Sequence, residues 1–286
     1  MTTALITGAT AGIGAAFARR LAGDGARLVL VARDEKRLAG VAAELTDRHG
    51  VPDDGPHEVL AADLTVDAER KAVEDRLRDR ADPVDTLVSN AGVGLPGRFW
   101  DADPDGIEAQ TVLGVTVVQR LMRAGLEGMV ERGQGTVLNV ASFAALLPGR
   151  NGAAYTAAKA YTVSLTSEVA ADLAAEGITG VRVLAVCPGW TRTELHARSG
   201  SDSPEASSSW WLDADQVVEQ ALADRDRGRT RSVPGDALQG APRRRRRPAP
   251  RVHAPLRGPY SPRWRAIRIF WTSLVPSPIS RIFESR

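Results

Sequence analysis

The sequence predicts an α/β protein with a doubly wound parallel sheet that is covered by helices on both faces. Two observations lead to this fold class. Over residues 1–237, short continuous apolar runs alternate with longer amphipathic segments, and a Gly-rich turn joins the first apolar run to the first amphipathic segment. Right-handed crossovers between the strands then produce a doubly wound sheet, here of about seven strands. Such sheets bind ligands beyond the carboxyl ends of their strands, where the winding direction reverses.

Six apolar runs are the expected strands, and an amphipathic segment follows each of the first five. The strands are expected at residues 4–7, 27–32, 59–62, 86–89, 136–140 and 181–186. The helices are expected near residues 12–23, 34–48, 67–80, 104–132 and 152–176. A further helix is expected behind Asp213, a suitable N-cap, because Val217, Val218, Ala221 and Leu222 have helical spacing.

The uneven distribution of charge predicts two parts, a domain at residues 1–237 and a tail at residues 238–286. The tail contains twelve Arg and one acidic residue, a net charge of +11, so the overall +2 leaves −9 for the domain. Eight of the seventeen Pro residues also lie in the tail, which we expect to be irregular. The basic pI therefore belongs to the tail, and we expect no nucleic-acid partner for the protein as a whole.

Several classes of protein are excluded by composition. The single cysteine, Cys187, excludes an intramolecular disulfide, and no run of 18 apolar residues exists that could span a membrane. The one Cys and four His residues are scattered, so no metal site is expected. The first ten residues lack the basic and apolar regions of a secretory signal, and a cytoplasmic location is expected.

A Gly-rich turn at residues 7–14 predicts a dinucleotide site. Gly8 permits a tight turn, while Gly12 and Gly14 let the backbone approach a pyrophosphate and let the helix pack close to the strand. The free N–H groups at the start of the following helix favour an anion. The alternative is a turn with a structural role only, since Gly-rich turns are common.

The residue after the second strand bears on the choice of cofactor. Arg33 offers a planar fork for the 2′-phosphate of NADP, whereas an acid there would bind the ribose diol of NAD. Asp34 keeps NAD as the alternative, and Arg33 could simply pair with Asp34 or Glu35 on the surface. Asp63, after the third strand, could accept from an adenine amino group or cap the next helix.

The turn after the fourth strand has room for a ribose. Asn90, Ala91 and Gly92 are small, and Asn90 could also form hydrogen bonds across strands. Taken alone, these three residues are typical of any turn that follows a strand.

A reactive group is predicted at the start of the long Ala-rich helix. Tyr155 and Lys159 are four residues apart and share one face of the helix. A neighbouring ammonium is expected to lower the pKa of Tyr155, which could then give a proton to a carbonyl oxygen as hydride reaches the carbon. Ser142, at the end of the fifth strand, could hold the substrate oxygen against the phenol, or bond only to local backbone.

These motifs resemble the short-chain dehydrogenase/reductase superfamily in its NADP-preferring form, over roughly residues 3–235. The resemblance implies a Rossmann-like fold and an NADP-dependent oxidoreductase, with NAD as the less favoured cofactor. It implies Ser142, Tyr155 and Lys159 as catalytic residues, and Ser142, Tyr155 and Trp190 as substrate contacts. The implied cofactor contacts are Gly8, Thr10, Gly12, Ile13, Gly14, Arg33, Asp63, Asn90, Ala91, Gly92, Tyr155, Lys159, Pro188, Gly189, Thr191 and Thr193.

The sequence departs from this family at two places. Members carry an Asn in the fourth helix that anchors a water next to the Lys, and the matching residue here is Gly114. Gly has no side chain to anchor this water, so the transfer of protons between solvent and the active site through it is in doubt. The alternative function is therefore an NADP-binding protein with impaired turnover.

The second departure is the tail at 238–286, which we interpret as a frameshifted or mispredicted extension. The alternative is a basic arm whose Trp264 and Trp271 contact an anionic membrane.

The substrate is expected to be a small hydrophobic ketone or secondary alcohol. Residues 196–212 are expected to cover it, and Leu146, Leu147, Trp190, Trp210 and Trp211 suggest an apolar pocket. The two adjacent Trp could instead pack under the following helix. The family resemblance implies a homodimer or homotetramer formed through the helices near 104–132 and 152–176, whose Ala-rich faces permit close approach.

Overall fold

The computed structural model describes residues 2–95, 97–146, 152–194 and 211–235. The predicted tail at 238–286, Leu147 and most of the segment at 196–212 therefore lie outside the described residues. The strands are β1 (Thr3–Thr7), β2 (Arg27–Ala32), β3 (Glu58–Ala61), β4 (Thr86–Ser89), β5 (Gly135–Val140), β6 (Val181–Val186) and β7 (Arg231–Ser232). The helices are α1 (Gly12–Gly23), α2 (Glu35–His49), α3 (Asp67–Arg78), α4 (Pro104–Thr111), α5 (Val118–Arg132), α6 (Ala153–Ala175) and α8 (Ala214–Asp226).

The seven strands form one parallel sheet in the order β3-β2-β1-β4-β5-β6-β7. The predicted doubly wound α/β fold is thereby confirmed. Strand order runs one way from β1 to β3 and the other way from β4 to β7, so the winding reverses between β1 and β4. A ligand site is expected beyond the carboxyl ends of these two strands. The residues there are Thr7 and Ser89, which end β1 and β4.

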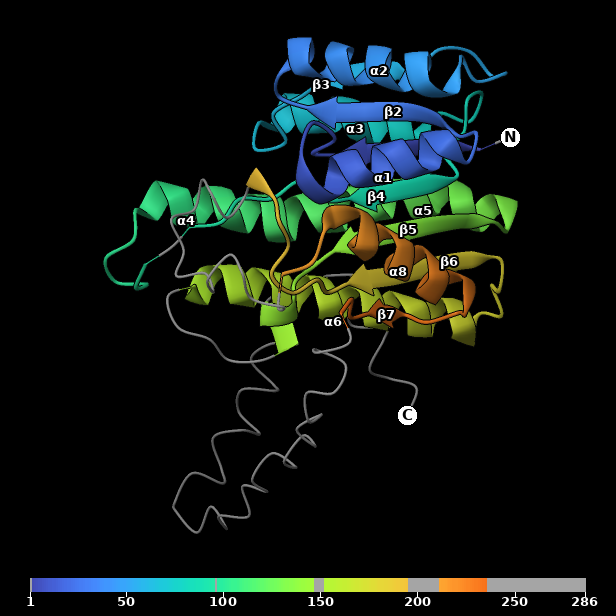
Figure 1. The fold of residues 1–286 in the computed structure, drawn as a ribbon. Helices are drawn as coiled ribbons and strands as arrows, with labels where there is room; N and C mark the ends of the chain where they lie inside the picture. Colours follow the sequence, from blue (N-terminus) through green and yellow to red (C-terminus); the bar gives the residue numbers. More distant parts are fainter. Residues whose placement is uncertain (1, 96, 147–151, 195–210, 236–286) are drawn as a thin grey trace, which may run out of the picture. The chain divides into compact units, whose positions relative to one another are not determined.

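Two helical layers cover the sheet (Figure 1). Each layer encloses its own apolar core against the sheet. One core lies under α1, α2 and α8, and the other under α3, α5 and α6. Side chains alternate between the faces along a strand, so Leu5 of β1 packs into the second core and Ile6 into the first. Both are fully buried, which explains why these strands read as continuous apolar runs.

The helix predicted near 104–132 is three segments rather than one. α4 passes into a π-helical turn, η1 (Val112–Val117), which continues into α5. A π-turn inserts an extra residue and is often found at functional sites. Its sequence, VLGVTV, contains four β-branched residues and Gly114, which are poor formers of regular helix. The predicted helical span of 104–132 is therefore present, but hydrophobic periodicity did not reveal the π-helical turn within it.

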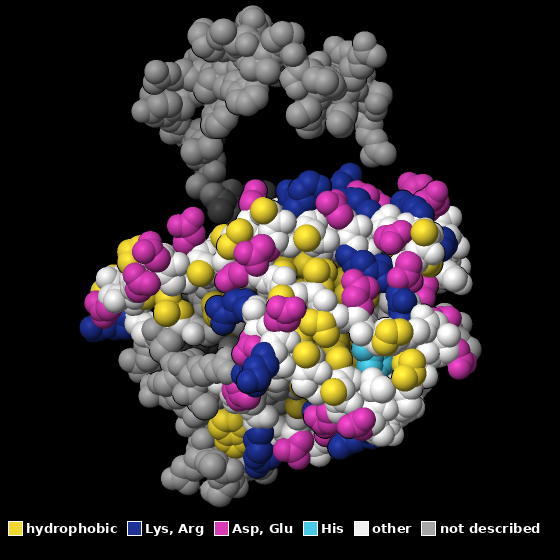
Figure 2. Space-filling model, turned by 90° about the horizontal axis from the view of Figure 1, so that it is seen from above, with side chains coloured by type: hydrophobic (Ala, Val, Ile, Leu, Met, Phe, Trp, Pro, Cys, Tyr) yellow, Lys and Arg dark blue, Asp and Glu magenta, His cyan; other side chains and the backbone are white. Residues whose placement is uncertain are grey.

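Charged side chains of both signs are mixed over the surface seen in Figure 2, with apolar patches between them. Many charged side chains of the described residues form ion pairs, such as Arg19 with Asp215 and Lys71 with Asp75. No helix within the described ranges is long and apolar enough to cross a membrane.

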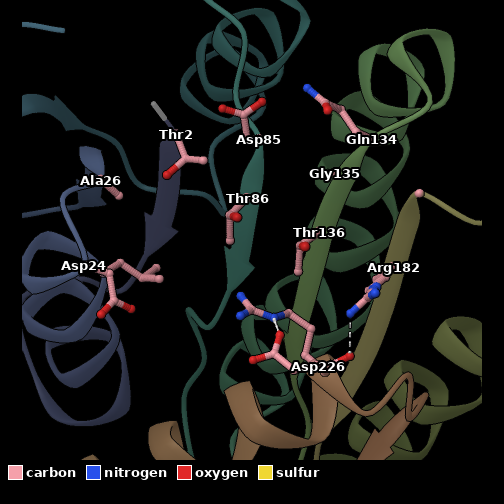
Figure 3. A pocket seen from close by; sticks show the side chains of 13 residues that line it. Thr2, Asp24, Ala26, Asp85, Thr86, Gln134, Gly135, Thr136, Arg182 and Asp226 are labelled. Atoms are coloured by element: carbon pink, nitrogen blue, oxygen red, sulfur yellow. Dashed lines mark hydrogen bonds and ion pairs between the residues drawn. The ribbon is translucent and has the colours of Figure 1, made fainter.

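A cavity of about 540 Å³ lies at the amino ends of the strands, beside α1 and α8. Figure 3 shows Asp24, Asp85, Asp226 and Arg182 around it. These charges are engaged locally, since Asp85 accepts from the Thr3 N–H at 3.0 Å and Arg182 donates to the Arg225 carbonyl at 3.1 Å. The cavity is at the opposite edge of the sheet from the predicted site and does not contribute to it.

Candidate functional site

The loop between β1 and α1 depends on glycine for its shape. Gly8 and Gly12 have positive φ angles of 66° and 54°, which L side chains rarely adopt. A Cβ at Gly14 would lie 2.2 Å from the Gly8 carbonyl oxygen and 2.5 Å from Asn90 Nδ2. Gly14 therefore lets α1 pack directly against the loop that precedes it. The structure thus gives two of the three glycines a conformational role and Gly14 a packing role.

Asn90 joins the ends of β1 and β4. Its Nδ2 donates to the Thr7 carbonyl at 3.0 Å and to the Gly8 carbonyl at 3.3 Å. The Thr7 hydroxyl accepts from the backbone N–H groups of Asn90 and Ala91, at 2.9 and 3.0 Å. The expectation that Asn90 bonds across strands is met at the point where the winding reverses. The sequence reasoning assigned no role to Thr7, although its hydroxyl directly before a Gly-rich turn was a usable signal.

The start of α1 is left free for an anion. Ala11 is the N-cap and supplies no side-chain hydrogen bond, and the first turn contains no acidic residue. The partial positive charge of the helix start is therefore not neutralised locally. Thr193, from the segment after β6, approaches this turn, because a Cβ at Gly12 would lie 2.9 Å from Thr193 Cγ2. Predicted residues from both halves of the sheet thus meet here.

Arg33 lies exposed after β2 and forms no hydrogen bond or ion pair with another described residue. The alternative pairing with Asp34 is not seen, since Asp34 is the N-cap of α2 and accepts from the Arg37 N–H at 3.0 Å. Arg37 reaches the loop instead, donating to the Thr10 carbonyl and pairing with Glu194 at 3.2 Å. The guanidinium of Arg33 is therefore available for a ligand.

Asp63 shapes the turn after β3. Its Oδ1 accepts from the Thr65 hydroxyl at 2.6 Å and from the Thr65 N–H at 2.9 Å. The Thr65 hydroxyl bond holds the pKa of Asp63 below its usual value, with a smaller contribution from Arg33. Val66 rather than Asp63 is the N-cap of α3, so the alternative assignment of Asp63 as that cap was wrong.

Ser142, Tyr155 and Lys159 are brought together where β5 ends and α6 begins. The Ser142 hydroxyl accepts from the Ala144 N–H at 3.2 Å and also bonds to the Tyr155 hydroxyl. Lys159 is 8% exposed, and its Nζ donates to the Val140 carbonyl at 2.7 Å. The same Nζ lies 5.8 Å from the centre of the Tyr155 ring. The shared helix face predicted for Tyr155 and Lys159 is present.

The pKa values at this cluster differ from the sequence expectation. Burial raises the pKa of Tyr155, and the hydrogen bond with Ser142 only opposes that shift. The net shift of the Tyr155 pKa is therefore upward, opposite to the expected lowering. Burial also lowers the pKa of Lys159 to about 8. A thiolate at Cys187 would raise it, but burial raises the pKa of Cys187 to about 12, so the thiol is neutral at ordinary pH.

Gly114 lies buried in η1 and faces the start of α6. A Cβ at this position would lie 2.8 Å from the Ala158 Cβ, one residue before Lys159. The Gly114 carbonyl accepts from the Thr162 hydroxyl at 3.2 Å. The close packing of η1 on α6 therefore explains in physical terms why a residue without a side chain stands here.

The segment after β6 connects the site to α8. The Pro188 carbonyl accepts from the Phe143 N–H at 2.8 Å, and the Gly189 carbonyl accepts from the Thr191 hydroxyl at 3.1 Å. Thr191 pairs with Leu212 in a parallel bridge. The rings of Trp190 and Trp211 lie 5.8 Å apart, centre to centre. Trp190 and Trp211 thus meet at the two ends of the segment 195–210, which, with Trp210, lies outside the described residues.

The remaining predicted contacts lie in the same region. Ile13 packs against the core under α1, and the Gly92 Cα faces Lys159, since a Cβ there would lie 3.7 Å from Nζ. Gln110 was not predicted as part of the site, yet it is buried beside it, and a polar residue in an amphipathic helix gives no signal of burial. No cluster of metal-ligating side chains occurs among the residues described.

Comparison with known proteins relates the chain to several oxidoreductases. A family model described as short chain dehydrogenase matches residues 2–204. The 2-(S)-hydroxypropyl-CoM dehydrogenase 3 of Xanthobacter autotrophicus is 36% identical over 206 residues, which cover 71% of this chain and 78% of that protein.

Two solved structures extend the comparison. A short-chain dehydrogenase from Sphingobium yanoikuyae in complex with NADPH has a TM-score of 0.74 and 33% identity, covering 97% of both chains. The bulky-bulky ketone specific alcohol dehydrogenase from Comamonas testosteroni has a TM-score of 0.70 and 28% identity, covering 97% of this chain and 96% of that one.

Proposed function

Since the chain belongs to the short-chain dehydrogenase family of oxidoreductases, we propose that it transfers hydride between NADP(H) and the carbonyl or secondary alcohol of a small hydrophobic substrate. Tyr155 acts as the general acid and base. The observation that carries this proposal is the cluster of Ser142, Tyr155 and Lys159 at the carboxyl end of β5, on the same edge of the sheet as the Gly-rich loop after β1. One of the similar solved structures contains NADPH, which supports the choice of cofactor.

The residues present fit a dinucleotide. The free start of α1 and the glycine loop would hold the pyrophosphate through backbone N–H groups. Asp63 would accept from the adenine amino group, and the turn of Asn90, Ala91 and Gly92 leaves space for a ribose. Residues 188–193 would contact the nicotinamide end. The dinucleotide supplies the hydride when bound, and the protein supplies binding, orientation and the proton.

Arg33 is the proposed determinant of NADP over NAD. Its guanidinium forms no hydrogen bond or ion pair with another described residue and can form paired hydrogen bonds with a 2′-phosphate. Asp34, the residue that would favour NAD, already caps α2. This cap occupies Oδ1, one of the two carboxylate oxygens of Asp34.

Tyr155 is suited to give a proton in the reductive direction. Because burial raises its pKa, the phenol is fully protonated at neutral pH. The Ser142 hydroxyl, bonded to Tyr155, would orient the substrate oxygen toward it. Lys159, with a pKa of about 8, is mainly an ammonium at neutral pH and stabilises the phenolate that remains after proton transfer. It would also bind the ribose hydroxyls on the nicotinamide side.

The proposed preference for an uncharged, apolar substrate rests on the residues around the cluster. Trp190 and Trp211 lie against each other after β6, and Leu146 packs near Ala141 and Cys187. Because fold does not determine substrate, the named substrates of similar proteins are not transferred to this chain.

Turnover tests the proposal. NADPH oxidation is measured with a panel of aliphatic and aromatic ketones, for the unchanged protein and for Tyr155→Phe. We expect Tyr155→Phe to reduce kcat by about 10²-fold or more. Tyr161→Phe is the matched control, because Tyr161 lies on the same helix but bonds to the exposed Gln119. If NADPH stabilises the folded protein but no ketone is reduced, the result would instead support the alternative function, an NADP-binding protein with impaired turnover.

One further proposal concerns the oligomeric state of the protein. We propose self-association through α5 and α6 as a homodimer or homotetramer, because Ala157 is exposed on α6 and permits close approach. Light scattering during size-exclusion chromatography tests it, and a monomer at all concentrations contradicts it. The cytoplasmic location and the domain boundary at residue 237 stay predictions.

A further inference from the structure

Gln110 is a polar side chain of α4 that is buried beside the catalytic cluster. It is 3% exposed, and its Nε2 donates to the Val93 carbonyl at 3.2 Å. Its Oε1 atom is buried as well and accepts no hydrogen bond from the described residues. Buried acceptors without a partner are rare in native proteins and carry a free-energy cost, so each one calls for an explanation.

Three contacts place Gln110 in the same part of the fold as Lys159. α4 packs against α6, and Gln110 precedes Gly114 by four residues, so the two lie on nearly the same side of their helix. Gly114 contacts Ala158, the residue before Lys159. Gln110 bonds to Val93, while the neighbouring Gly92 faces Lys159 Nζ. The Gln110 amide and the Lys159 ammonium thus approach the same short segment, residues 92–93.

We infer that Gln110 is a positioning residue for proton transfer: its Oε1 accepts a hydrogen bond from a water molecule that in turn accepts one from Lys159 Nζ. This inference rests on the proposed function. It gives the buried Oε1 a hydrogen-bond partner. The Nε2 bond to Val93 fixes the amide so that Oε1, the acceptor, faces away from that carbonyl.

The inference predicts that the Gln110 acceptor stabilises the charged form of Lys159. The other titratable groups near this ammonium are Tyr155 on α6 and Cys187 after β6. The acidic residues of α4, Asp105 and Glu108, are exposed, while η1 and β5 contain no titratable residue. A change at Gln110 therefore has few routes to Lys159 other than the proposed water.

The lysine content of the chain makes a direct test possible. Lys36, Lys71 and Lys159 are its only lysines. Labelling lysine at Nζ with ¹⁵N yields three side-chain signals for NMR titration. Lys36 and Lys71 are exposed, so the signal that titrates near pH 8 belongs to Lys159. This readout does not require turnover.

Two variants at position 110 separate the acceptor from the donor. Gln110→Met keeps the volume but removes both, and we expect the pKa of Lys159 to fall by about half a unit or more. Gln110→Glu keeps the acceptor and loses the donor to Val93, and the pKa is expected to rise. Gln119→Met, the same change at an exposed residue of α5, is the control and leaves the pKa unchanged.

Equal pKa values of Lys159 in Gln110→Met and Gln119→Met would overturn the inference. A fall in Gln110→Glu as large as in Gln110→Met would also overturn it, because it would assign the effect to the lost bond with Val93. In turnover, we expect Gln110→Met to lower kcat about tenfold with little change in the KM for NADPH. If Gln110→Met changes neither the pKa of Lys159 nor kcat while Tyr155→Phe abolishes turnover, only this inference fails. If the unchanged protein reduces no ketone, the proposed function fails, and the NMR titration still decides the role of Gln110.

Discussion

Replacing Lys159 with Met is expected to stabilise the folded protein at neutral pH while it abolishes turnover. The side chain is 8% exposed, and burial lowers its pKa from 10.5 to about 8. A difference of this size corresponds to about 3 kcal/mol of free energy by which folding disfavours the ammonium. Met has a similar length and no charge, so it removes this cost and fills the same space.

The sign of the pH dependence follows from the two pKa values. Below about pH 8, Lys159 is charged in both the folded and the unfolded chain, and the full cost is present. Between about pH 8 and 10.5 the folded protein releases its proton first, and the cost declines. The advantage of Lys159→Met is therefore greatest at neutral pH and disappears as the pH rises through this window.

Urea unfolding at about pH 7 and again at about pH 10 measures this effect. We expect Lys159→Met to gain about 2 kcal/mol at the lower pH, somewhat less than the cost because the hydrogen bond to Val140 is lost. Lys71→Met is the control, since Lys71 is an exposed residue paired with Asp75, and such pairs contribute less than about 1 kcal/mol. A Lys159→Met variant that is no more stable at about pH 7, or whose gain is independent of pH, would show that burial of the Lys159 ammonium does not destabilise the fold.

The remaining predictions concern the cofactor loop, its specificity and the relay. Arg33→Ala should weaken NADPH binding about tenfold or more and leave NADH binding nearly unchanged, as measured by calorimetric titration; equal losses for both cofactors would contradict the assignment. Gly14→Ala should cost about 3 kcal/mol in unfolding experiments because its Cβ would meet the Gly8 carbonyl, whereas Gly40→Ala, in open space on α2, should be neutral or stabilising. Gly114→Asn alone should lower kcat, because its Cβ meets Ala158, and adding Ala158→Gly should recover activity; a rate increase in the single variant would contradict the packing account.

Most of the architecture could be predicted because each strand is buried on both faces. Residues 27–32 and 181–186 coincide with β2 and β6, and the predicted helix near 12–23 coincides with α1. Asp213 is the N-cap of α8 as expected. Continuous apolar runs and capping residues are local signals, and they survive without knowledge of the fold.

Features that depend on tertiary packing could not be predicted from local patterns. The π-turn at η1 arises where Gly114 packs on Ala158, a contact between residues distant in sequence. The pKa of Tyr155 was expected to fall because Lys159 shares its helix face, but burial raises it, and burial is set by the surrounding elements. Gln110 was not recognised because the sequence does not show that its amide turns inward.

Isotope transfer tests whether hydride and proton transfer take place at the cluster of Ser142, Tyr155 and Lys159. NADPH carrying deuterium at the transferred position is incubated with the best ketone of the panel, and the alcohol is analysed by mass spectrometry. The account predicts one deuterium on the carbinol carbon with the unchanged protein and with Tyr161→Phe, and almost no alcohol with Tyr155→Phe. Deuterated alcohol formed at an undiminished rate by Tyr155→Phe would contradict it.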